Sequence, residues 1–347
     1  MNVLLLPKNE LSSFVAGLME RYRVVAPVQR NEELRFDEVA SPGEAVLDYR
    51  NTVKAPKGVL LPQVDCLMRF GQRRDDYNHI QAVPLDEAPT IILGVRPCDA
   101  RSMVFLDAIF GQGKYTDPYY LARRKNTLVF ALACDHPRQT CFCHAFGSGP
   151  YDRTGADVFM REAGDAYLME TVSERGAQAL EAAHLATADS HHIDAAQRIE
   201  ATALAEMGEI APVAGIEEVL PSLFNSPLWQ EISEKCLACG TCTFACPTCH
   251  CFNIEDRLVA QGGERVRAWD SCQFPIFTLH ASGHNPRPDQ AARWRQRLLH
   301  KFQYLPQNVG LYGCVGCGRC VAACPVCLDI REVVRRVRQE DKAGAKA

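Results

Sequence analysis

The segment 236-CLACGTCTFACP-247 places four cysteines at the spacing C-x2-C-x2-C-x3-C, with a proline directly after the last one. The segment 314-CVGCGRCVAACP-325 repeats this spacing. Four thiolates hold a [4Fe–4S] cluster, and in two-cluster proteins the fourth cysteine of such a run ligates the other cluster. Gly240 and Gly318 allow backbone N–H groups to approach the sulfurs.

The two runs therefore predict two [4Fe–4S] clusters that exchange their fourth ligands. The first cluster is assigned to Cys236, Cys239, Cys242 and Cys324, and the second to Cys314, Cys317, Cys320 and Cys246. Zinc is the alternative, but zinc sites usually pair two C-x2-C knuckles across a longer loop. Runs of three knuckles that end in Cys-Pro and occur twice fit zinc poorly.

The 67 residues between Cys246 and Cys314 look largely helical, in 253-NIEDRLVAQ-261 and 289-DQAARWRQRLLHKFQYL-305. This pattern predicts a mainly α-helical two-cluster ferredoxin domain over 226–337, with a disordered tail at 338–347. The tryptophans and the basic stretch in this region predict core or a subunit contact, with an exposed basic face as the alternative; they are Trp229, Trp269, Trp294 and 293-RWRQR-297.

The first half of the chain alternates strand and helix signals, which predicts an α/β domain over 1–185 and a helical connector over 186–225. The apolar runs 89-PTIILGV-95 and 126-NTLVFALAC-134 are typical of strands buried on both faces. Asp99 is predicted to be the N-cap of the helix after the first of these strands. The segment 157–172 predicts a hairpin that turns near Gly164.

A third group of cysteines, in the first half, comes after these strands: Cys98, Cys134, Cys141 and Cys143. If the strands are parallel, Cys98 and Cys134 lie at the same edge of the sheet, where α/β folds place ligands. The adjoining helix N-terminus would then favour a thiolate at Cys98. A third [4Fe–4S] cluster is our main hypothesis; buried unligated thiols, which explain Cys66 well, and a structural zinc stay open.

Three more cysteines lie just after the first run or in 269-WDSCQF-274: Cys249, Cys251 and Cys272. His250, His280 and His284 lie nearby in the sequence. An extra metal site, sulfur chemistry and core packing all remain open for this trio. Cys327 receives no role.

Composition bounds the class of protein. The 347 residues carry a net charge of −4, with 47% hydrophobic and 23% charged residues, so nothing points to nucleic acid or to a membrane. The longest apolar run, 128–134, is too short to span a bilayer. Seventeen cysteines in a chain without a visible signal peptide predict reduced, metal-binding thiols in the cytoplasm. No P-loop or dinucleotide motif occurs, so no nucleotide site is expected.

Several segments together resemble the β, iron–sulfur subunit of cytoplasmic sulfhydrogenases, which are NAD(P)-linked [NiFe]-hydrogenases; the pattern is also similar to the electron-transfer subunit of anaerobic sulfite reductase. The resemblance lies in the two cysteine runs, 269-WDSCQF-274, 282-SGHNPR-287, 95-VRPCDARSMVFLD-107 and the Cys141–Cys143 group. It implies an electron-transfer subunit between a flavin, NAD(P)-binding subunit and a catalytic partner, either the small and large hydrogenase subunits or another reductase subunit.

Two other classes of function stay open at this stage. The chain could itself reduce sulfur or polysulfide near Cys249, Cys251 and Cys272, although no catalytic constellation is evident. A zinc-bound assembly scaffold is the remaining alternative.

Overall fold

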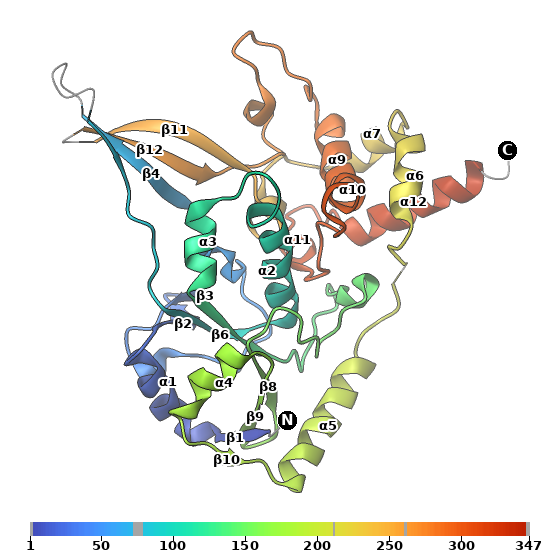
Figure 1. Ribbon diagram of the computed structural model, residues 1–347. Coiled ribbons are helices and arrows are strands. Elements are labelled where there is room, and N and C mark those ends of the chain that lie inside the picture. The colour runs from blue at the N-terminus through green and yellow to red at the C-terminus, as the bar shows by residue number, and fades with distance from the viewer. Residues whose placement is uncertain (1–2, 72–78, 211, 260–261, 345–347) are drawn as a thin grey trace.

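Two β-sheets organise the chain. The computed structural model describes residues 3–71, 79–210, 212–259 and 262–344. Within them, one sheet has eight strands in the order β10-β1-β9-β8-β7-β6-β2-β3, and the other has four in the order β11-β12-β4-β5. Figure 1 shows the large sheet in the N-terminal half and the small sheet on the side of the molecule that carries β11 and β12.

The centre of the large sheet is parallel: β2, β6, β7 and β8 run in the same direction. Strands β6 and β7 are buried along their whole length, as their continuous apolar sequences predict. The predicted hairpin near Gly164 is confirmed, because β8 and β9 pair antiparallel around it. The strands of this sheet are β1 (Leu4–Pro7), β2 (Arg23–Arg30), β3 (Glu33–Glu38), β6 (Thr90–Val95), β7 (Thr127–Leu132), β8 (Val158–Glu162), β9 (Ala166–Thr171) and β10 (Ala186–Thr187).

Helices cover both faces of this sheet, which confirms the mixed α/β class of the N-terminal half. Helices α1 (Leu11–Met19) and α4 (Glu174–Glu181) pack on one face. Helices α2 (Pro97–Phe110) and α3 (Pro118–Lys125) pack on the other. The resulting three layers bury apolar residues on both sides of β6 and β7, so these central strands firmly position the loops at their carboxyl ends.

The small sheet joins the two halves of the chain. Its strands are β4 (Val64–Phe70), β5 (Ile80–Ala82), β11 (Phe252–Val259) and β12 (Gly262–Trp269). The helix expected over 253–261 is wrong: β11 pairs with β12, and β12 pairs with β4 of the N-terminal half. A Cβ at Gly263 would lie 2.2 Å from the ring of Phe70, so glycine permits this pairing. Residues 260 and 261 lie outside the described part.

Helices pack around a second core in the C-terminal part. They are α6 (Ile216–Val219), α7 (Leu228–Ser233), α8 (Thr241–Phe244), α9 (Gln290–Leu299), a π-helix (His300–Tyr304), α10 (Leu305–Val309), α11 (Arg319–Ala322) and α12 (Ile330–Gly344). Helix α5 (Ser190–Ala205) packs instead against β8 and β9 of the large sheet. Trp229 and Trp294 are buried in this core, as predicted. The C-terminal part therefore combines helices with the β11–β12 hairpin, and the segment predicted as a helical connector contains α5, α6 and the short strand β10.

The C-terminal tail is ordered further than the sequence predicts. Helix α12 runs to Gly344, so the expectation of disorder from residue 338 is wrong for the backbone up to that residue. Val333, Val334 and Val337 are buried in the second core and hold the helix there. Residues 345–347 lie outside the described part.

Two buried ion-pair networks connect the halves. Arg123 of α3 and Arg267 of β12 both donate to the carboxylate of Asp65 on β4, at 2.7 to 2.9 Å. Arg319 of α11 donates to both oxygens of Asp99 on α2, at 2.5 and 2.6 Å. Asp99 is therefore not the N-cap of α2; Arg96 occupies that position and Pro97 begins the helix. The Asp99 carboxylate therefore binds Arg319 of another helix, α11, and does not cap its own helix, α2.

We expect Asp99→Asn to lower the stability of the whole chain. The substitution keeps the side-chain shape but leaves the buried Arg319 guanidinium without its counter-charge, a change that typically costs on the order of 3–5 kcal/mol. Urea denaturation followed by circular dichroism measures the effect. Glu264→Gln, at the exposed ion pair with Arg69, is the control and should barely move the midpoint. Equal midpoints for Asp99→Asn and the unsubstituted protein would contradict this expectation.

Candidate metal centres

The two cysteine runs share the same backbone path. Gly240 and Gly318 both have positive φ, 73° and 70°, and begin the short helices α8 and α11. Two residues earlier, Ala238 and Gly316 are also left-handed, at 55° and 65°. Each run therefore winds through two left-handed residues between its first three cysteines. This repeated geometry agrees with a duplicated ligand loop.

The second predicted set of cysteines lines one cavity. Cys246 comes from the first run, and Cys314, Cys317 and Cys320 come from the second, as the exchange of fourth ligands requires. Arg297 and Lys301 line the same cavity. Helices α8 and α11 contact each other, which brings the end of one run beside the start of the other.

The first set lies nearer the surface. The Cys236 sulfur accepts a hydrogen bond from the Gln290 amide at 3.2 Å, and Cys239 is exposed, 3.4 Å from Thr241 Oγ1. Burial raises the pKa of the Cys242 thiol, and the neighbouring Cys272 and Cys236 raise it further. Cys324 accepts the Leu328 N–H at 3.2 Å. The grouping of Cys324 with the other three stays a prediction.

The four N-terminal cysteines meet at the predicted edge of the large sheet. Cys98, Cys134, Cys141 and Cys143 line one pocket, together with Arg96 and Cys317. Because β6 and β7 are parallel, the residues after Val95 and Leu132 reach the same edge.

The electrostatic surroundings of Cys98 differ from those expected. The N-terminus of α2 was expected to favour a thiolate there, but burial and the Asp99 carboxylate oppose it and raise the pKa of this thiol well above its usual range. Burial also raises the pKa of Cys134 to about 11 and of Cys143 to about 12. Without a bound metal, this edge of the sheet therefore favours neutral thiols.

The 140–143 loop packs directly against the second run. Phe142 N–H donates to the Gly316 carbonyl at 2.8 Å, and the Cys141 sulfur lies 3.8 Å from the carbonyl oxygen of Cys317. A Cβ at Gly316 or Gly318 would lie 2.4 to 2.5 Å from backbone atoms of this loop. The Phe142 side chain is buried in the second core. Loop and run therefore form one continuous structure.

Spacing of the sulfurs tests a single zinc ion against a cluster. All 17 cysteines are free and lie in the described part of the chain, yet no three of their sulfurs lie within 4.8 Å of one another. Two sulfurs on one zinc are at most about 4.6 Å apart, because each bond is about 2.3 Å. In a [4Fe–4S] cluster each thiolate binds a different iron, so the sulfurs stand further apart. In the described residues, no three thiols therefore stand at the spacing that a single zinc ion requires.

Three buried cations face the cysteines of the C-terminal part. Lys57, Arg297 and Lys301 are 3%, 2% and 4% exposed. Lys301 Nζ donates to Cys246 Sγ at 3.4 Å, Arg297 Nη1 donates to Cys249 Sγ at 3.7 Å, and Lys57 Nζ donates to the Cys249 carbonyl at 2.7 Å. Within the described ranges, no carboxylate oxygen lies within 4.0 Å of these cations. Buried unpaired charges are very costly, so thiolate sulfur is the counter-charge for Arg297 and Lys301. Lys57 lies 4.1 Å from the centroid of the Trp269 ring, and burial lowers its pKa.

The pKa directions agree with this pairing. Burial by itself lowers the pKa of a lysine, but the Cys246 and Cys249 thiolates outweigh it and raise the pKa of Lys301 above its usual range. The Cys249 thiol hydrogen-bonds to Cys246 and, together with Lys301 and Arg297, holds the pKa of Cys246 well below its usual range. Lys301 lies in the π-helix, a distortion that is frequent at functional sites.

The sequence did not reveal these cations. The stretch 293-RWRQR-297 was expected in the core, at a subunit contact or on an exposed basic face, and the structure buries Arg293 and Arg297. A basic residue at every fourth position of α9 and its continuation, at 293, 297 and 301, is the signal that points to this buried side. Lys57 carries no comparable signal. His280 and His284 lie in an exposed loop, with ring centroids 5.3 Å apart.

The trio Cys249, Cys251 and Cys272 also lines one pocket, beside the cavity of the second set. The Cys251 thiol hydrogen-bonds to Cys272 and lowers the pKa of Cys272 to about 5, against the effect of burial. Gln273 Nε2 lies 3.5 Å from the Cys272 sulfur and donates to it. The sequence placed these cysteines near the first cluster; Cys272 does neighbour Cys242 of the first set, and Cys249 contacts Cys246 of the second set.

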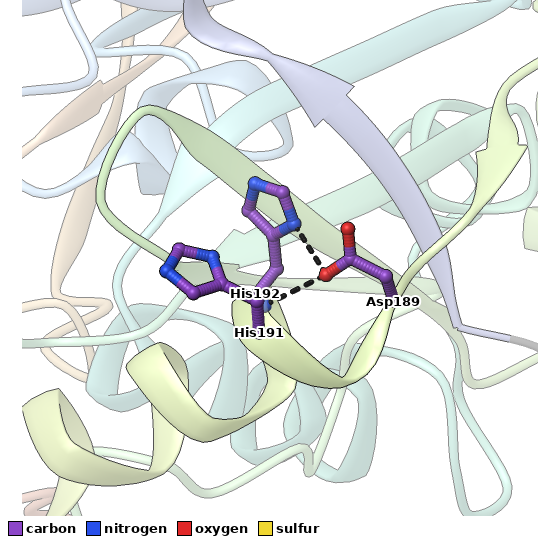
Figure 2. A group of neighbouring side chains, drawn as sticks. All are labelled: Asp189, His191 and His192. Atoms are coloured by element: carbon purple, nitrogen blue, oxygen red, sulfur yellow. Dashed lines mark hydrogen bonds and ion pairs between the residues drawn. The ribbon is translucent and has the colours of Figure 1, made fainter.

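Asp189, His191 and His192 have ligand atoms within 4.8 Å of one another, in an exposed position at the start of α5 (Figure 2). Asp189 is the N-cap of this helix: its carboxylate accepts the His192 N–H at 3.0 Å and lies 2.7 Å from His192 Nδ1. His192 Nε2 also lies 3.2 Å from Asp165. Capping of α5 accounts for these contacts.

Comparison with known proteins gives the family. A model described as a 4Fe–4S dicluster domain matches residues 235–328, which contain both cysteine runs. The chain is 32% identical over 329 residues to sulfhydrogenase 2 subunit beta of Pyrococcus furiosus, and the match covers 94% of this chain and 95% of that protein. The chain belongs to the sulfhydrogenase β-subunit family. The resemblance seen in the sequence is confirmed, and no solved structure matches significantly.

As a member of the sulfhydrogenase β-subunit family with a dicluster domain, the chain is an iron–sulfur electron-transfer subunit, as predicted. A β subunit implies a complex with further subunits. In the described residues, every helix is too short or too polar to span a membrane.

Lys301→Met should make the potential of the cluster at Cys246 more negative in this sulfhydrogenase β-family chain. The substitution removes a buried positive charge 3.4 Å from the Cys246 sulfur and keeps a side chain of similar length. A nearby cation favours the reduced, more negatively charged form of a cluster, and hydrogen bonds to its sulfurs tune the potential. A redox titration followed by electron paramagnetic resonance measures the shift.

Lys235→Met is the matched control, because Lys235 precedes Cys236 but is exposed. It should leave both potentials almost unchanged, since water screens its charge. If Lys301→Met also leaves them unchanged, the assigned role of Lys301 is wrong.

Proposed function

We propose that the chain relays electrons between a flavin, NAD(P)-binding subunit and a hydrogenase-type catalytic subunit, and that three sets of four cysteines hold [4Fe–4S] clusters for this purpose. The sets are Cys236, Cys239, Cys242 and Cys324; Cys314, Cys317, Cys320 and Cys246; and Cys98, Cys134, Cys141 and Cys143. Each cluster supplies the capacity to accept and release one electron. The name of the Pyrococcus relative, a sulfhydrogenase subunit, supports the hydrogenase-type partner.

The observation that carries this proposal is the contact between the 140–143 loop of the N-terminal half and the second cysteine run. The first and second sets share the two runs, and the 140–143 loop contacts the second run through the Phe142–Gly316 hydrogen bond. The N-terminal set and the second set therefore meet at the boundary between the two halves, where Cys317 lines the N-terminal pocket. A chain that only docked its partners would not need its N-terminal cysteines at that boundary.

The residues of the chain provide the surroundings that such a relay requires. Among the twelve thiols of the three sets, Cys143, Cys246 and Cys317 are buried and most others are half-buried, whereas Cys239 is exposed. Arg96 lies in the N-terminal pocket, and Arg297 and Lys301 lie in the second. These cations offset the negative charge of thiolate-ligated clusters, so the interior remains close to neutral when the sites are filled. The exposed position of Cys239 supports contact with a partner subunit there.

We place the complex in the cytoplasm. The support is the set of 17 free cysteines, since such a density of unpaired thiols suits a reducing compartment.

The double variant Cys134→Ser and Cys141→Ser tests the relay in the assembled complex. We expect iron and acid-labile sulfide to fall by about four of each per chain. Hydrogen-dependent reduction of NAD(P)+ should be lost, whereas dye reduction by hydrogen and by NAD(P)H, each measured at its own end of the complex, should persist. Metal analysis and the three activity assays together test whether the N-terminal set takes part in electron transfer.

Cys66→Ser is the control, because Cys66 lies on β4 outside the three sets, with its sulfur near the Met68 carbonyl. It should change neither the iron content nor the three activities. If the double variant loses its iron but still couples hydrogen to NAD(P)+, the N-terminal set is not part of the relay.

A further inference from the structure

The pocket of Cys249, Cys251 and Cys272 lies outside the three proposed sets, yet it has the features of a built site. Three thiols line it together with Arg297, Lys301 and the imidazoles of His250 and His300. Two of the sulfurs have polar donors: Arg297 Nη1 at 3.7 Å from Cys249 and Gln273 Nε2 at 3.5 Å from Cys272. Donors of this kind surround ligand sulfurs in metal centres.

Charge balance indicates that the pocket holds more than neutral thiols. Arg297 and Lys301 line both this pocket and the cavity of the second set, and Lys57 reaches the Cys249 carbonyl from the N-terminal half. Two buried positive charges, Arg297 and Lys301, thus lie between two groups of cysteines, whereas burial lowers the pKa of Lys57. Arg297 Nε lacks a hydrogen-bond partner altogether. Cations buried to this degree require anions, and metal-bound thiolates on both sides supply them.

One imidazole that lines the pocket, that of His250, has its tautomer fixed by a hydrogen bond. His250 Nδ1 lies 2.9 Å from the Thr248 carbonyl oxygen. Since a carbonyl only accepts, Nδ1 carries the proton and the lone pair lies on Nε2. A hydrogen bond from the far nitrogen to a backbone carbonyl is the usual way in which a protein fixes a metal-binding histidine. The rings of Phe105, Phe110 and His300 enclose this imidazole, with centroids 5.7 to 5.9 Å away.

The sulfur positions select the kind of centre. The three sulfurs of Cys249, Cys251 and Cys272 do not all lie within 4.8 Å of one another. Three thiolates bound to one zinc ion would have to be closer together than this. A centre with several irons accommodates the trio once metal bonds replace the hydrogen bond between Cys251 and Cys272, because each thiolate then binds its own metal.

We propose that Cys249, Cys251 and Cys272 hold a further [4Fe–4S] cluster through three thiolates, with His250 at its fourth corner. This centre lies beside the second set, next to Cys246, and forms a branch of the relay instead of a link in its line. It is independent of the partners named above, so the two proposals can fail separately.

The double variant Cys251→Ser and Cys272→Ser tests the site in the complete chain. The expected result is a loss of about four iron and about four acid-labile sulfide per chain relative to the unsubstituted protein, with no zinc in either. Cys66→Ser, which lies outside every site, should lose neither. Unchanged iron, or about one zinc per chain lost on substitution, would overturn the proposal.

If the variant does not fold, native mass spectrometry of the unsubstituted chain tests the site instead, because it counts the clusters bound per chain. The mass should correspond to about four [4Fe–4S] clusters. A mass for about three clusters would overturn the extra site but leave the relay intact. In contrast, a relay failure would appear in the coupled hydrogen and NAD(P)+ assay without a change in this mass.

Discussion

The ion pair between Arg319 and Asp99 fixes the position of the cysteines of the N-terminal half relative to those of the C-terminal half. Asp99 is completely buried, and the Arg319 side chain is 2% exposed, so neither charge has water as an alternative partner. Asp99 comes directly after Cys98, and Arg319 lies between Cys317 and Cys320. The guanidinium also donates to the Thr52 carbonyl at 2.9 Å. The planar Arg319 guanidinium thus connects the second cysteine run with Asp99 at the edge of the large sheet and with the loop that contains Thr52. Its fixed donor geometry allows little displacement of these three parts.

The interior of the C-terminal part differs in kind from that of the N-terminal half. Around β6 and β7 the core is apolar, and its stability comes from burial of hydrocarbon. Around Arg297 and Lys301 the interior contains positive charge, and sulfur is the element that balances it. The polypeptide by itself is therefore incomplete there, because neutral thiols would leave the cations uncompensated. The binding of clusters and the folding of this region are expected to be coupled for that reason.

Local patterns in the sequence predicted the structure correctly where a strand or a cysteine run depends mainly on its own residues. The apolar runs gave β6 and β7, their parallel direction brought Cys98 and Cys134 to one edge, and the spacing of the runs gave the second set of four. The local patterns gave wrong predictions where the structure of a segment depends on residues far away in the sequence. Segment 253–259 has polar and apolar residues in an order that a helix could use, but its neighbour β12 pairs with β4, and Gly263 fits against Phe70. Likewise, Asp99 could serve as an N-cap, yet a charge 220 residues away takes its carboxylate.

Strand order in the small sheet has a consequence for the biosynthesis of the chain. Strand β4 leaves the ribosome long before β12, which lies on its other side from β5 in the finished sheet. Until β12 is made, one edge of β4 has no neighbouring strand within the chain. Asp65 on β4 also lacks its ion pair with Arg267 until then, because Arg267 lies on β12. The N-terminal half therefore cannot reach its final form during its own synthesis. Metal loading that involves the junction must therefore come after the synthesis of β12, about 200 residues later than that of β4.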